Sequence, residues 1–66
     1  MALGETEREM AVRHVAEQEE RIARQDILID SLRSLGMPLD DALDLLASMQ
    51  DLLDDMRDHV SRLRRN

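Results

Sequence analysis

The second half of the chain places apolar residues at alternating intervals of three and four positions. The series is Leu39, Ala42, Leu46, Met49, Leu53, Met56, Val60 and Leu63. This alternation keeps a narrow apolar stripe along one side of an α-helix, and such a stripe is stable when another helix packs against it. A similar series, with two polar members, comes earlier: Ala11, Val15, Gln18, Ile22, Gln25, Ile29 and Leu32. We therefore expect two helices that pack along these two series, called the inner stripes below.

Signals for helix ends agree with this periodicity. Thr6 followed by Glu9 matches a capping box, in which each side chain accepts a hydrogen bond from the other residue's backbone amide. Gly36 tolerates the left-handed conformation that closes a helix, and Pro38 fits the first turn of a new helix. We predict one all-α domain over residues 1–66, with a first helix at about 7–35, a turn at 36–38 and a second helix at about 39–64.

An antiparallel hairpin would align the two inner stripes layer by layer. It would place Val15 opposite Val60, Ile22 opposite Leu53, Ile29 opposite Leu46, Gln18 opposite Met56 and Gln25 opposite Met49. Two interpretations of the glutamines follow. They could hydrogen-bond to a second copy and fix the register of the assembly. Alternatively, this part of the stripe could be partly exposed and so tolerate a polar side chain.

A chain of 66 residues buries a limited core, and small domains usually need disulfides, metals or assembly for stability. Cysteine and aromatic residues are absent, so assembly is the remaining route. Further apolar residues flank the inner stripes, and such exposed groups mark an interface. We predict a dimer of hairpins that forms a four-helix bundle. The predicted interface residues are Val15, Ile22, Leu28, Ile29, Leu32, Leu35, Leu43, Leu45, Leu46, Met49, Leu52, Leu53, Met56 and Val60.

The sequence carries no pattern typical of an enzyme. It has no cysteine nucleophile and no glycine-rich phosphate loop. A net charge of −6 disfavours nucleic acid as a partner. No apolar run approaches the ~20 residues of a membrane span, and no basic stretch followed by an apolar one indicates a signal peptide. We expect a cytoplasmic, non-catalytic interaction module that binds its own copies and needs no cofactor.

Two alternative functions remain at this point. Residues 40–58 carry seven aspartates and one arginine, so the second helix could dock on a basic surface of another protein and regulate it. The second alternative is a metal site, because the hairpin would bring His14 and His59 to the same layer. Each histidine has a carboxylate on its own helix face, which makes the candidate ligands His14, Glu17, Asp55 and His59.

The basic residues Arg62, Arg64 and Arg65 cluster at the C-terminal end. Positive charge there stabilises the end of a helix through its dipole. We expect these arginines to pair with Asp58 or with the acidic start of the first helix; contact with a phosphate or an acidic partner is the alternative.

The segment His14-Val15-Ala16-Glu17-Gln18-Glu19-Glu20-Arg21-Ile22-Ala23-Arg24-Gln25 resembles a pattern found in short uncharacterised bacterial proteins. In that pattern, H-V-A-E-x-E-x-x-I-x-x-Q precedes a Leu-x-x-x-Gly turn and a leucine-rich second helix. Here the turn corresponds to residues 32–36, and the second helix contains Ala42-Leu43-Asp44-Leu45-Leu46. The resemblance implies a helical hairpin and no particular activity. Met37 and Pro38 differ from the polar residues of that turn.

Overall fold

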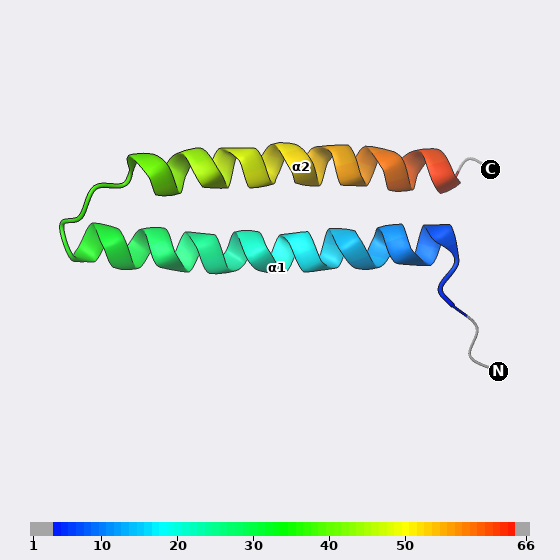
Figure 1. Cartoon of the computed structure of the whole chain (residues 1–66), viewed down its shortest axis with the longest axis horizontal. Helices are drawn as coiled ribbons and strands as arrows, with labels where there is room; N and C mark the ends of the chain where they lie inside the picture. Colours follow the sequence, from blue (N-terminus) through cyan, green and yellow to red (C-terminus); the bar gives the residue numbers. More distant parts are fainter. Residues whose placement is uncertain (1–3, 65–66) are drawn as a thin grey trace.

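The computed structural model describes residues 4–64, which form two α-helices and no β-strand. Helix α1 spans Glu7–Ser34 and helix α2 spans Asp40–Arg64. The helices run antiparallel and side by side, so the start of α1 and the end of α2 lie at one end of the molecule (Figure 1). We call this the open end. The fold is an all-α helical hairpin, as predicted.

Helix α1 begins with the predicted capping box. The Glu9 amide donates to the Thr6 hydroxyl at 3.0 Å, and the Thr6 amide donates to the Glu9 carboxylate at 3.0 Å. These two bonds satisfy backbone amides that have no partner within the helix. Glu7 and Glu9 add negative charge to the first turn, where the helix dipole favours it.

A Schellman motif closes α1 around Gly36. The Met37 amide donates to the Leu32 carbonyl at 2.9 Å, and the Gly36 amide donates to the Arg33 carbonyl at 3.1 Å. Gly36 has a φ of 71°, a left-handed conformation that is costly for any residue with a Cβ. The prediction of Gly36 as the helix-closing residue is confirmed, and α1 ends one residue before the expected position.

Helix α2 begins one residue later than expected. The Leu43 amide donates to the Leu39 carbonyl at 2.9 Å, so Leu39 is the cap and Asp40 is the first helical residue. Pro38 therefore lies inside the predicted turn at 36–38, and it precedes the cap instead of occupying the first turn of α2. The physical reason is that Schellman closure and return of the chain occupy residues 35–39, which leaves the fixed φ of proline in the connection.

The inner stripes form the contact between the helices. Every member of both series is buried or half-buried, and within residues 4–64 Glu17 is the one other residue that is not exposed. The most buried apolar side chains are those of Ala11, Ile29, Leu53 and Val60. None of the described side chains falls below 2% exposure, so this core is thin.

Candidate functional site

Two glutamines cross the core of the hairpin. Gln18 is 2% exposed, and its Nε2 donates to the Met49 carbonyl at 2.9 Å. Gln25 is 8% exposed, and its Nε2 donates to the Ala42 carbonyl at 2.9 Å. The second interpretation offered by the sequence is therefore wrong, because these side chains are buried. They donate to carbonyls of α2 in the same chain, and a bond to a second copy stays a prediction.

The two glutamine bonds also repeat along the hairpin. From Gln18 to Gln25 is one heptad, and from Met49 back to Ala42 is one heptad. Each acceptor is seven residues closer to the turn than the side chain predicted to lie opposite. A helical carbonyl points toward the C-terminus of its helix, which accounts for part of this offset, and the long glutamine side chain spans the remainder.

The two broad faces of the hairpin differ, and helical spacing assigns residues to them. In an antiparallel pair, residues one position before an inner-stripe residue lie on one face for both helices, and residues one position after lie on the other. Glu19 follows Gln18 and Arg57 follows Met56. Their ion pair at 2.8 Å bridges the helices and places both on the same face, as this geometry requires.

Exposed leucines gather on the face that precedes the inner stripes. Leu28, Leu45 and Leu52 are each one position before an inner-stripe residue, and Leu35 is one heptad after Leu28. Their exposures are 48%, 52%, 46% and 73% in that order. We call these four residues the leucine face. They extend from the turn to about the middle of the helices.

The predicted interface residues divide into two groups. Nine of the fourteen pack inside the hairpin itself and are buried or half-buried: Val15, Ile22, Ile29, Leu32, Leu46, Met49, Leu53, Met56 and Val60. The other five are exposed, and four of them are the leucine face. Leu43 is 43% exposed, but it follows Ala42 and therefore lies on the opposite face.

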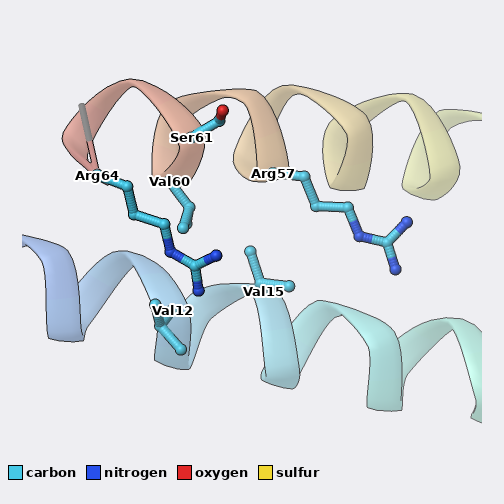
Figure 2. A pocket seen from close by; sticks show the side chains of 6 residues that line it. All are labelled: Val12, Val15, Arg57, Val60, Ser61 and Arg64. Atoms are coloured by element: carbon cyan, nitrogen blue, oxygen red, sulfur yellow. The ribbon is translucent and has the colours of Figure 1, made fainter.

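A pocket of about 270 Å³ opens on that opposite face near the open end of the hairpin. Its lining residues, which define the valine–arginine pocket, are Val12, Val15, Arg57, Val60, Ser61 and Arg64. Figure 2 shows the Arg64 side chain reaching from α2 toward α1, while the Arg57 guanidinium points away from the other five side chains. The sequence patterns did not indicate this pocket, because inner-stripe valines and flanking residues of two separate helices create it only when the helices pair.

The histidines do not form a metal cluster with the candidate carboxylates. His14 and His59 are both exposed, and both precede inner-stripe valines. Glu17 accepts from Arg13 at 3.3 Å, and Asp55 is exposed. Within residues 4–64, no three His, Cys, Asp or Glu side chains gather closely enough to hold a metal ion. The geometry therefore lends no support to a metal site at these residues.

The charged ends of the hairpin pair locally. Arg62 pairs with Asp58, as predicted, whereas Glu5 pairs with Arg13 at 2.8 Å. The Arg13 guanidinium, which donates to Glu5, holds the pKa of Glu5 below its ordinary value, and the same contact raises the pKa of Arg13. No ion pair joins the described C-terminal arginines to the acidic start of α1 within residues 4–64. Arg65 lies outside the described residues.

Comparisons with protein-family models, curated proteins and solved structures give no match for this chain. Within residues 4–64, neither helix is both long and apolar enough to cross a membrane. What the fold and its surface define is a class: an all-α helical hairpin with one exposed leucine face.

Proposed function

We propose that this chain is a non-catalytic assembly module that pairs with a second copy through the leucine face. The exposed leucines carry the proposal. Four large apolar side chains on one face of so small a protein form a patch of the kind that marks an interaction site. Their partner in a four-helix bundle is the same face of another hairpin.

The exposed area supports a second copy as the partner. The chain exposes 5211 Å². A compact protein of 7.6 kDa exposes about 4,300 Å². The excess of roughly 900 Å² is close to the roughly 800 Å² that each partner buries in a standard interface. The dimer would also cover a thin core that lacks aromatic residues and disulfides.

The position of the leucines favours one arrangement of the two hairpins. They occupy the half of the molecule nearest the turn, so two leucine faces overlap when both turns lie at the same end. With the turns at opposite ends, each leucine cluster would face the half that carries His14, Arg21 and His59. The same-end arrangement places α1 of one copy against α2 of the other in antiparallel packing. Arg21 and Arg24 of α1 then face an α2 that carries Asp55.

Sedimentation equilibrium at micromolar concentration tests the pairing. The wild-type chain should have twice the mass of the monomer. Leu52→Asp should give a helical monomer, because it places a carboxylate in the apolar interface. The matched control is Leu43→Asp, at a leucine of similar exposure on the opposite face, which should remain dimeric. A folded wild-type monomer, or equal loss of assembly in both variants, would contradict the proposal.

Spin labelling tests the arrangement. The chain has no cysteine, so Met37→Cys gives a single attachment point in the exposed turn. The same-end dimer should give a short distance between the two labels. A distance approaching the 51 Å length of the molecule would show that the turns lie at opposite ends.

A regulator that binds another protein is the second candidate, and the acidic surface of α2 favours it. Asp58 pairs with Arg62, but the other six aspartates of α2 form no ion pair within residues 4–64. A basic protein surface would complement them. Capture of one stoichiometric partner from native lysate, lost in the double variant Asp51→Asn/Asp54→Asn and kept in Asp26→Asn on α1, would favour this candidate. Equal capture by both variants would exclude it.

A further inference from the structure

The valine–arginine pocket combines an apolar floor with a cationic group. Val60 is 8% exposed and Val15 is half-buried, so their methyl groups line a region that the helix pairing partly shields from water. Val12 extends this surface from α1. The pocket lies on the face opposite the leucine face, so pairing through that face leaves it open.

The two arginines of the pocket differ in what they bind. Arg57 is committed to Glu19 by an ion pair at 2.8 Å, and its guanidinium points away from the pocket (Figure 2). Arg64 forms no ion pair within residues 4–64, and its guanidinium ends between the helices near the valines (Figure 2). Its planar set of N–H donors matches the two oxygens of a carboxylate.

The charged residues that line the pocket, Arg57 and Arg64, are both cationic although the chain is acidic. Arg8 precedes Val12 by four residues and so lies on the same side of α1. Glu5 and Glu9 lie on that side as well, but Glu5 pairs with Arg13 and Glu9 caps the helix through Thr6. The volume of about 270 Å³ lies just below the range of about 300–1,000 Å³ typical of ligand pockets. A short aliphatic chain with one anionic end fits both the size and the charge.

We propose that the valine–arginine pocket binds a small aliphatic carboxylate, with its chain on Val12, Val15 and Val60 and its carboxylate on Arg64. This site is independent of the dimer interface. Binding should tighten with chain length from acetate through butyrate to hexanoate, by up to about fourfold for each added methylene that is fully buried.

Amide-detected NMR titration of the full chain at constant ionic strength tests the site. Hexanoate should shift the signals of the pocket residues saturably and bind at least tenfold more tightly than acetate or 1-hexanol. Arg64→Gln should weaken hexanoate binding at least fivefold. Arg62→Gln is the matched control, because Arg62 lies on the other face and pairs with Asp58, and it should leave binding unchanged.

Three results would overturn the proposal. Equal affinity for 1-hexanol and hexanoate would show that the anion is not recognised. Equal effects of Arg64→Gln and Arg62→Gln would show that only general charge matters. Shifts confined to Leu28, Leu45 and Leu52 would place the ligand on the leucine face. Because Arg64→Gln leaves that face intact, sedimentation of the same variant separates a failed ligand site from a failed dimer.

Discussion

The Gln18 side chain donates a hydrogen bond across the hairpin to the backbone carbonyl of Met49 at 2.9 Å. Gln25 makes the same kind of bond one heptad along. A side-chain amide that must meet one carbonyl at a given height resists axial sliding of the helices, which apolar contacts alone resist poorly. The two glutamines therefore fix the register of the two helices inside a thin core.

Removal of the Gln18 hydrogen bond should destabilise the hairpin. Gln18→Ala deletes the cross-helix bond and leaves space in the most buried position of the structure, so we expect a loss of about 1–2 kcal/mol in the free energy of unfolding. Gln50→Ala, at an exposed position of α2, should change it by less than about 0.5 kcal/mol. Urea denaturation at one fixed protein concentration measures both. Equal effects would mean that Gln18 has no structural role.

Substitutions at two adjacent leucines should separate folding from assembly. Leu53 is 8% exposed inside the hairpin, whereas Leu52 is 46% exposed on the leucine face. Leu53→Asp buries an unpaired carboxylate and should abolish the helical circular dichroism signal at neutral pH. Leu52→Asp should keep most of that signal. Retention of full helicity in Leu53→Asp would show that the inner stripe is assigned to the wrong side.

The turn should depend on the left-handed conformation of Gly36. Its φ of 71° costs an alanine roughly 1–2 kcal/mol, although a Cβ at this position would meet no atom within 4 Å. Gly36→Ala should therefore lower the midpoint of thermal unfolding by several degrees. Gly4→Ala also meets no atom within 4 Å and lacks the positive φ, so its midpoint should not change. A Gly36→Ala midpoint equal to that of the wild type would argue against the Schellman turn.

Acid should weaken the start of α1. The Thr6 amide, which donates to the Glu9 carboxylate, holds the pKa of Glu9 below its ordinary value of 4.5. A lowered pKa contributes stability that is fully present above the ordinary value and is lost as the pH falls through the lowered one. The difference in thermal midpoint between the wild type and Glu9→Gln should therefore shrink as the pH falls below 4.5. A difference that stays constant down to strongly acidic pH would contradict the capping contact.

Local signals in the sequence were sufficient for the secondary structure. The Thr6 and Glu9 pattern, Gly36 and the alternating apolar series each act within a few residues, so they identify helix ends and the buried side without knowledge of the fold. Local signals do not report the length of the closing turn, which depends on how the two helices meet. For this reason they did not show that Pro38 precedes the first turn of α2. The partners of Gln18 and Gln25 could not be predicted, since a side-chain pattern does not show which backbone carbonyls lie within reach.

The sequence by itself determined that there are two helices, where they start and stop to within one residue, and which side of each is apolar, because helical periodicity and capping are short-range effects. Only the tertiary structure decided which residues share a face of the hairpin. In the antiparallel pair, Leu28 and Leu52 lie on one face and Leu43 lies on the other. Val12 of α1 and Arg64 of α2 line the same pocket. These relationships depend on the relative rotation and height of two helices, and that is a property of their packing rather than of either helix alone.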